Sequence, residues 1–145
     1  MPFLRACSSL ISAVVVAAAA SLSGAAFAQS APARDYTPQV GQEGKDVIWV
    51  PTPQALVDRM LQMAGVTAKD YVVDLGSGDG LTVITAAKKL GARALGIEYN
   101  PDMVELSKRN AAKEGVSARA SFMKADIFET DFSDATVVTL YLLPQ

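Results

Sequence analysis

The chain has 145 residues, a formal net charge of -2 and no histidine. Its length suits one domain, and the lack of a basic stripe argues against nucleic acid as a partner. The missing histidine excludes Ser-His-Asp triads, histidine general bases and most zinc sites, so any chemistry depends on carboxylates, hydroxyls, backbone dipoles or a cofactor. The one cysteine, Cys7, lies in a segment that we expect to be removed.

Residues 1–28 are predicted to be a secretory signal peptide, and residues 29–45 a flexible linker. Arg5 supplies the positive start, residues 10–22 form an apolar run, and residues 26–28 (AFA) fit a small-x-small cleavage site. An uncleaved membrane anchor is the alternative, but the run is short and rich in alanine for a spanning helix. We therefore expect an exported chain, periplasmic or secreted, with no stable membrane span after cleavage.

Helices and strands alternate along the rest of the chain. The expected helices show apolar residues at helical spacing, and the last strand is continuously apolar, which favours burial on both faces. Thr52 is predicted to cap the first helix, with Pro53 at the first helical position. The alternation predicts an α/β fold with a doubly wound parallel sheet. The expected elements are an arm or strand at 46–50, helices at 53–64, 81–90 and 102–114, and strands at 71–74, 92–98, 119–124 and 136–143.

The stretch Tyr71–Gly80 (YVVDLGSGDG) combines a buried strand, a glycine-rich turn and a helix start. Because such a turn lacks Cβ atoms, a ligand can approach its backbone closely. A dinucleotide site carries G-x-G-x-x-G, whereas here Gly76, Gly78 and Gly80 alternate and Asp74 stands two residues before the first of them. A carboxylate in this place would repel a pyrophosphate and suits a cationic ammonium. The pattern therefore indicates S-adenosylmethionine as the ligand.

Two further acids, Glu98 and Asp126, end the next two expected strands. Glu98 is expected to accept hydrogen bonds from both hydroxyls of a ribose. Asp126 is expected near the adenine edge, with Ile127 and Phe128 covering the ring, although a plain loop acid is an equally good interpretation of Asp126. All these acids fall at the carboxyl ends of strands, where open α/β sheets bind their ligands.

From about Asp46 to its end, the chain resembles the class I, seven-strand S-adenosylmethionine-dependent methyltransferases. The glycine turn together with Glu98 carries the resemblance to this superfamily. Within it, the chain is similar to the branch around the lysine methyltransferases of the ATP synthase c subunit and their bacterial relatives. The segments that carry this similarity are Val50–Pro53 (VPTP), Leu75–Gly80 (LGSGDG), Gly96–Glu98 (GIE) and Ala135–Pro144 (ATVVTLYLLP).

The resemblance implies a Rossmann-like sheet of which the chain holds the N-terminal part, about four core strands, with residues 46–145 forming a C-terminally truncated cofactor-binding domain. It also implies methyl transfer from S-adenosylmethionine to a protein lysine or another amine. Tyr141 lies where the family's fourth strand faces the methyl group, so we expect it to position the acceptor. The expected cofactor-binding residues are Thr52, Asp74, Gly76, Ser77, Gly78, Glu98, Asp126 and Ile127.

Two other interpretations stay open at this point. An NAD-type oxidoreductase shares the strand–turn–helix pattern, but the glycine spacing and Asp74 oppose it. The second is a non-catalytic, truncated remnant that binds S-adenosylmethionine. Half of the expected sheet would be missing from it, and its fourth strand would form an open apolar edge. Export is itself at odds with a methyltransferase, since S-adenosylmethionine is made in the cytosol.

Overall fold

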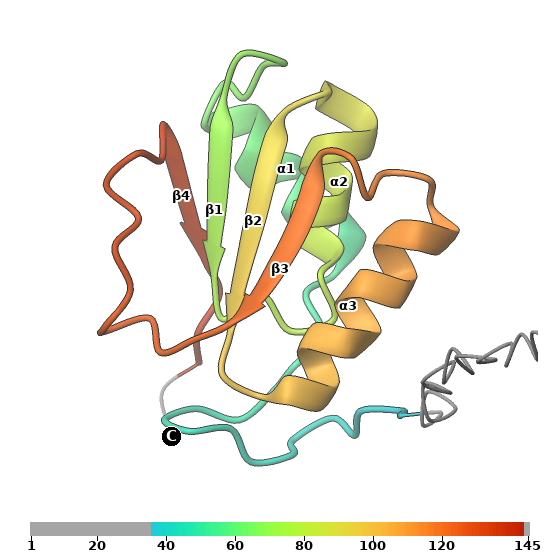
Figure 1. The fold of residues 1–145 in the computed structure, drawn as a ribbon, viewed down its shortest axis with the longest axis vertical. Helices are drawn as coiled ribbons and strands as arrows, with labels where there is room; N and C mark the ends of the chain where they lie inside the picture. The colour runs from blue at the N-terminus through green and yellow to red at the C-terminus, as the bar shows by residue number, and fades with distance from the viewer. Residues whose placement is uncertain (1–35, 144–145) are drawn as a thin grey trace, which may run out of the picture. The chain divides into compact units, whose positions relative to one another are not determined.

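Four parallel strands form one sheet in the order β3-β2-β1-β4, with helices packed beside it (Figure 1). The computed structural model describes residues 36–143. The predicted parallel α/β sheet is confirmed, whereas the predicted signal peptide and the first part of the predicted linker lie outside the described residues. The elements are α1 (Gln54–Met63), β1 (Tyr71–Leu75), α2 (Leu81–Leu90), β2 (Arg93–Glu98), α3 (Pro101–Lys113), β3 (Ala120–Lys124) and β4 (Val137–Leu140).

The helix boundaries follow from local chemistry. Helix α2 spans the residues predicted for it, and it ends at Gly91, whose left-handed φ of 71° closes the last turn. Helix α3 starts after Asn100, whose side chain accepts a hydrogen bond from the Asp102 amide at 2.9 Å. The predicted cap of α1 is wrong: Pro53, not Thr52, is the N-cap residue, and its carbonyl accepts the first helical amides without any side-chain cap.

All three helices pack on one face of the sheet. Their apolar residues form a single buried cluster with strand residues of that face, such as Val72, Ala94 and Phe122. The opposite face carries a smaller cluster around Val73 and Ile97, which residues of the β3–β4 connection cover. Between residues 36 and 143 no helix lies on this second face, so the doubly wound arrangement predicted from the sequence is not seen in this part of the chain.

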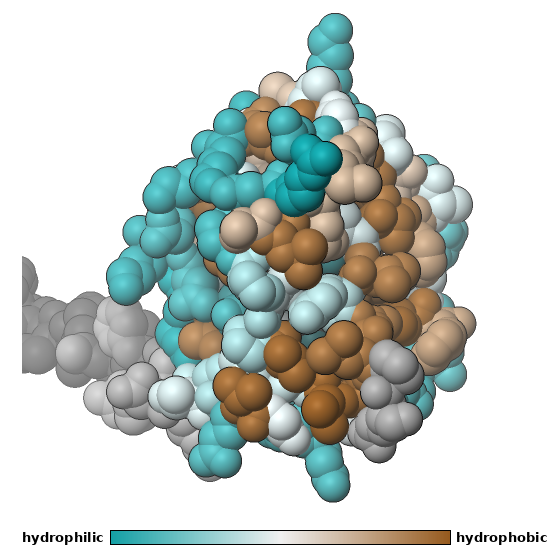
Figure 2. Space-filling model, turned by 180° about the vertical axis from the view of Figure 1, so that it is seen from behind, coloured by the Kyte–Doolittle hydropathy of each residue, from teal (hydrophilic) through white to brown (hydrophobic). Residues whose placement is uncertain are grey.

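Among the residues that the structure describes, strand β4 lies at the edge of the sheet, which corrects the expectation that it is buried on both faces. It pairs with β1 on one side only, and Val138 and Leu140 are 43% and 57% exposed. Of its residues only Thr139 is buried. Seen from behind, the hydrophobic surface gathers along the side of the molecule that carries β4 (Figure 2). A continuously apolar sequence predicts burial only when both neighbours of the strand are present.

The segment before α1 forms an arm rather than a strand. Its only pairing within the described residues is an isolated bridge between Glu43 and Ile48. The arm crosses the end of the sheet to which the strand arrows point (Figure 1). It therefore covers the carboxyl ends of the strands, where the sequence placed the ligand.

Replacing Gly80 should destabilise the fold more than replacing Gly115, although both have positive φ (87° and 70°). A Cβ at Gly80 would lie 2.8 Å from the Phe122 ring and 2.9 Å from Ser107 Cβ, whereas a Cβ at Gly115 would meet no atom within 4 Å. We expect Gly115→Ala to cost about 1 kcal/mol of backbone strain and Gly80→Ala about 1–3 kcal/mol more from overpacking. Urea unfolding of both variants measures this, and equal losses would contradict the packing shown for Gly80.

Candidate functional site

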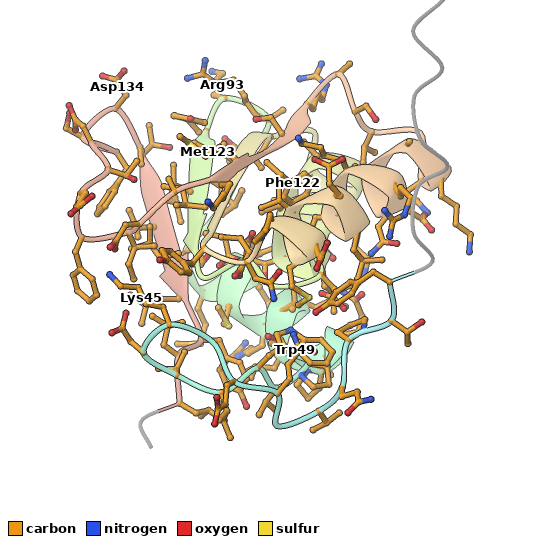
Figure 3. The ribbon with its side chains drawn as sticks, turned by 60° about the horizontal axis from the view of Figure 1, so that its bottom comes forward. Lys45, Trp49, Arg93, Phe122, Met123 and Asp134 are labelled. Atoms are coloured by element: carbon orange, nitrogen blue, oxygen red, sulfur yellow. The ribbon has the colours of Figure 1, made fainter. Side chains whose placement is uncertain are left out.

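A cavity opens at the carboxyl edge of the sheet, between the strand ends and the arm. Figure 3 brings this edge forward and shows Lys45 and Trp49 on the arm that crosses it. The structure brings together in this one cavity every residue that the sequence predicted for the site, from five different segments of the chain. These residues are Thr52, Asp74, Gly76, Ser77, Gly78, Glu98, Asp126, Ile127 and Tyr141. Their individual roles remain predictions.

The glycine turn is bent over the end of β2. The amides of Gly76 and Ser77 both donate to the Ile97 carbonyl, at 2.9 and 3.1 Å. Gly76 and Gly78 have φ values of 73° and 54°, a region that favours glycine. A Cβ on Gly78 would lie 2.7 Å from Trp49 Nε1, so glycine is required here by both conformation and space.

Helix α3 fixes the outer side of the same turn. The Ser107 hydroxyl donates to the Gly78 carbonyl at 2.8 Å, and the Asn110 side-chain amide donates to the Asp79 carbonyl at 2.9 Å. Ser107 is fully buried, which shields its hydrogen bond from water. The turn is therefore held on both sides before any ligand arrives, which lowers the entropy cost of binding.

Glu98 has a structural role that the sequence did not reveal. One carboxylate oxygen accepts the Gly78 amide at 3.0 Å, and the other accepts the Asn100 amide at 2.9 Å. Each oxygen retains a second lone pair, so the carboxylate can still accept hydrogen bonds from a diol. Glu98 thus links the glycine turn to the start of α3 and also lines the cavity.

Asp74 is buried at the end of β1, with 5% of its surface exposed. Burial raises the pKa of its carboxyl to about 7, and the charges of Glu98 and Asp79 act in the same direction. Hydrogen bonds from Thr139 and Thr82 oppose this rise in the pKa. Within residues 36–143 Asp74 makes no ion pair. A buried carboxylate at a cavity wall that is surrounded by acids is suited to receive a cation.

Asp79 adds to the negative potential of the turn. One of its carboxylate oxygens accepts the Leu81 amide at 3.2 Å, the geometry of an acid at a helix start. Burial raises the pKa of this carboxyl above its ordinary value. Together with Asp74 and Glu98, it makes this end of the cavity unfavourable for a phosphate and favourable for a cation.

The other end of the cavity is formed by Asp126 and the arm. Lys45 pairs with the Asp126 carboxylate, and its ammonium lies 5.4 Å from the Tyr99 ring and 6.0 Å from the Phe128 ring. The hydrogen bond from Lys45 lowers the pKa of Asp126 below its ordinary value. Phe128, expected to cover a ring, is 77% exposed, so it stands at the rim rather than inside. Ile127 lines the cavity and packs against the second hydrophobic cluster.

Three of the predicted residues, Ser77, Thr52 and Tyr141, line the cavity in different ways. The Ser77 hydroxyl is buried, lies 2.5 Å from where a Cβ of Gly96 would be, and has no hydrogen-bond partner among the described residues. It therefore fills space above β2, while Ser77 also lines the cavity. Thr52 lines the cavity without capping α1. Tyr141 lines it from the segment that follows β4.

Sequence reasoning missed several residues of the cavity wall. Tyr99 and Asn100 directly follow Glu98, so their position after a strand-end acid was an available signal. Met103 lines the wall from the first turn of α3, and its sequence signal is only that of an apolar helix position. Lys45 is 81 residues from Asp126 in the chain, and no local pattern signals their pairing.

Comparison with known proteins agrees with this geometry. Residues 74–145 match the family model of the ANTKMT methyltransferase domain. A protein-lysine N-methyltransferase of Saccharolobus islandicus is 48% identical over 98 residues, which are 67% of this chain and 61% of that protein. The human lysine N-methyltransferase of the ATP synthase c subunit is 37% identical over 97 residues, which are 67% of this chain and 41% of that protein.

Solved structures show the same fold. An RNA methyltransferase from Salinibacter ruber, in complex with S-adenosyl-L-homocysteine, matches with a TM-score of 0.64 and 55% identity over 66% of this chain and 62% of that chain. A methyltransferase from Geobacter sulfurreducens, also in complex with S-adenosyl-L-homocysteine, matches with a TM-score of 0.55 and 26% identity over 61% of this chain and 36% of that chain.

These findings confirm the resemblance predicted from the sequence. In sequence and fold the chain is similar to the class I S-adenosylmethionine-dependent methyltransferases. Within that class it is similar to the branch of the lysine methyltransferases of the ATP synthase c subunit and related protein-lysine methyltransferases. The chain spans 61% of the Saccharolobus relative and 62% of the Salinibacter chain. In the part that the structure describes, no helix has the length and apolar character needed to cross a membrane.

The stability of the fold should depend on pH through Asp74. Because burial raises its pKa to about 7, the folded state keeps a proton that the unfolded chain releases near pH 4. The stabilisation is complete below about pH 4 and is lost as the pH rises through about 7. Asp74→Asn should therefore flatten the fall in unfolding free energy over this range by a few kcal/mol, as measured by urea unfolding at several pH values.

Asp70 is the matched control for this experiment, because its pKa is lowered by hydrogen bonds from Thr67 and Thr136. Its contribution to stability is lost as the pH falls, so Asp70→Asn should change the acid end of the profile only. An unchanged slope between about pH 4 and pH 7 in Asp74→Asn would contradict the burial of this carboxyl.

Proposed function

We propose that the chain is the cofactor-binding part of an S-adenosylmethionine-dependent methyltransferase that acts on a protein lysine or another amine. The observation that carries this proposal is the buried Asp74 carboxylate, which lacks a cation among residues 36–143 and stands beside a glycine turn. A carboxylate in this place with no cation partner is suited to bind an ammonium group of the ligand. The names of the similar proteins support the same activity.

The residues fit the parts of this cofactor in order. Asp74 and Glu98 lie at the carboxyl ends of β1 and β2, and Asp126 directly follows the end of β3; these three strands are neighbours in the sheet. Adjacent strands lie about 4.8 Å apart, so the three acids form a line along the edge. Asp74 would hold the ammonium of the amino acid end and Glu98 the ribose hydroxyls. Asp126 and Ile127 would contact the adenine.

Bound S-adenosylmethionine supplies a methyl group on a cationic sulfur, which is reactive without help from an acid or base. The task of this chain is then to orient the cofactor and to exclude water. Trp49 packs against the glycine turn, and the arm covers the edge on the solvent side. Tyr141 lines the cavity and would position the acceptor. No histidine is required, because an amine nucleophile loses its proton before transfer and desolvation near a cation favours the neutral form.

A protein amine is the acceptor class that we favour. The net charge of -2 provides no basic surface for the phosphates of a nucleic acid. Two of the similar proteins are named for lysine methylation, whereas the Salinibacter neighbour is named an RNA methyltransferase. Incubating the chain with radiolabelled S-adenosylmethionine and separate protein, RNA and small-amine fractions tests this choice. Label in the RNA fraction alone would refute it, and label in none would leave a cofactor-binding chain without transferase activity.

Binding of S-adenosylhomocysteine is the direct test of the site. We expect Asp74→Ala and Glu98→Ala each to weaken binding about tenfold or more, because each removes a hydrogen-bonded charge that faces the ligand. Glu105→Ala is the matched control, since Glu105 is an exposed acid on α3 that pairs with Lys108 away from the cavity. Isothermal titration calorimetry measures all three variants. Equal affinity in the wild type and both cavity variants would refute the proposed site.

A further inference from the structure

Thr139 differs from the rest of β4. Its neighbours Val138 and Leu140 are exposed, but Thr139 is 6% exposed and lies directly opposite Asp74 in the pairing of β4 with β1. Its hydroxyl donates to the Asp74 carboxylate at 2.6 Å. Both side chains are buried, so the hydrogen bond is shielded from water and is stronger than a surface contact.

We propose that Thr139 is a positioning residue, which orients the Asp74 carboxylate and stabilises its charged form, and so sets the pH range over which the cavity accepts a cationic ligand. This inference rests on the proposed function, because the cation that we envisage is the ammonium of S-adenosylmethionine. It goes further by giving edge strand β4 a part in cofactor binding. Thr139 acts through Asp74 and need not touch the cofactor.

Most of the surroundings of Asp74 disfavour its charged form, so the hydrogen bond from Thr139 matters for its ionisation. Glu98 from β2 and Asp79 from the glycine turn face it with like charges, and burial acts in the same sense. The groups that favour its charged form are the hydroxyls of Thr139 and, from α2, Thr82. Because no cation among residues 36–143 pairs with Asp74, these two hydroxyls are the groups that oppose the effect of burial and of the neighbouring acids on its ionisation.

Removing the Thr139 hydroxyl should raise the pKa of Asp74 further, since the hydrogen bond lowers it. Thr139→Val keeps the shape and loses the donor, whereas Thr139→Ser keeps the donor. We expect the Asp74 titration midpoint to move up by about one pH unit in Thr139→Val and to stay near the wild-type value in Thr139→Ser. The matching loss of S-adenosylhomocysteine affinity at neutral pH is up to about tenfold.

Thr136→Val is the matched control. Thr136 immediately precedes the same strand, but its hydroxyl donates to the half-buried Asp70 at 2.8 Å, at the opposite end of β1 from the cavity. This variant removes a threonine–aspartate hydrogen bond of the same kind without touching Asp74. It should leave both the Asp74 titration and the affinity for S-adenosylhomocysteine unchanged.

Two measurements on the full chain test the proposal. Carbon-13 NMR of the side-chain carboxyls follows the Asp74 titration without ligand, and calorimetry between about pH 5 and pH 8 follows S-adenosylhomocysteine binding. Titration of the ligand itself is common to all variants and cancels in the comparison. The NMR spectra also report whether each variant is folded, and Thr139→Ala, which lacks the donor as well, takes the place of Thr139→Val if that variant does not fold.

The outcomes separate the two proposals. Matching upward shifts of the NMR midpoint and the binding profile in Thr139→Val alone support the role of Thr139. An NMR midpoint that does not move, or binding that weakens equally at every pH, overturns it and leaves Thr139 a packing residue. A further outcome is that the wild type shows no S-adenosylhomocysteine binding while the NMR midpoint shifts in Thr139→Val. This result refutes the proposed cofactor and the role of Thr139 in binding it. The coupling between Thr139 and Asp74 would still stand.

Discussion

The site depends on one backbone carbonyl, that of Ile97 at the end of β2. It accepts hydrogen bonds from two successive amides of the glycine turn, Gly76 and Ser77, at 2.9 and 3.1 Å. Two amides can converge on one oxygen only if the chain turns sharply, and the positive φ values of Gly76 and Gly78 provide that turn. The turn then lies over β2 instead of continuing away from β1. As a result the acids that end β1 and β2 face the same cavity.

The same constraint explains why so much negative charge gathers in a small space. Glu98 is held next to the turn because its carboxylate accepts the Gly78 amide, and Asp79 lies within the turn itself. Asp74 is thereby buried close to two other acids, and its pKa rises to about 7. The fold tolerates this cost because hydroxyls and backbone amides donate to the carboxylates. A ligand with a cationic end would relieve the remaining repulsion, which is the physical reason for linking this site to S-adenosylmethionine.

Local patterns in the sequence were sufficient for the sheet, the helices and the strand-end acids, because caps, glycines and apolar spacing act over a few residues. They failed where distant parts of the chain meet. One miss was local and only one residue wide: Thr52 was expected to cap α1, but Pro53 takes that position. The apolar run of β4 predicted a buried strand, yet burial depends on a second neighbour that residues 36–143 do not supply. The pairing of Lys45 with Asp126 arises from how the arm crosses the sheet, and no local pattern records it.

We propose that the cavity at the carboxyl edge of the sheet binds S-adenosylmethionine. A titration of the isotopically labelled chain with S-adenosylhomocysteine, followed by NMR of the backbone amides, tests it most directly. We expect saturable shifts at the glycine turn Gly76–Gly80, at Glu98 and at Asp126. Little change is expected in a second groove between α1 and α2, which is lined by Asp58, Leu61, Thr85 and Leu90 among others. Absence of any saturable shift, or shifts confined to that groove, would contradict it.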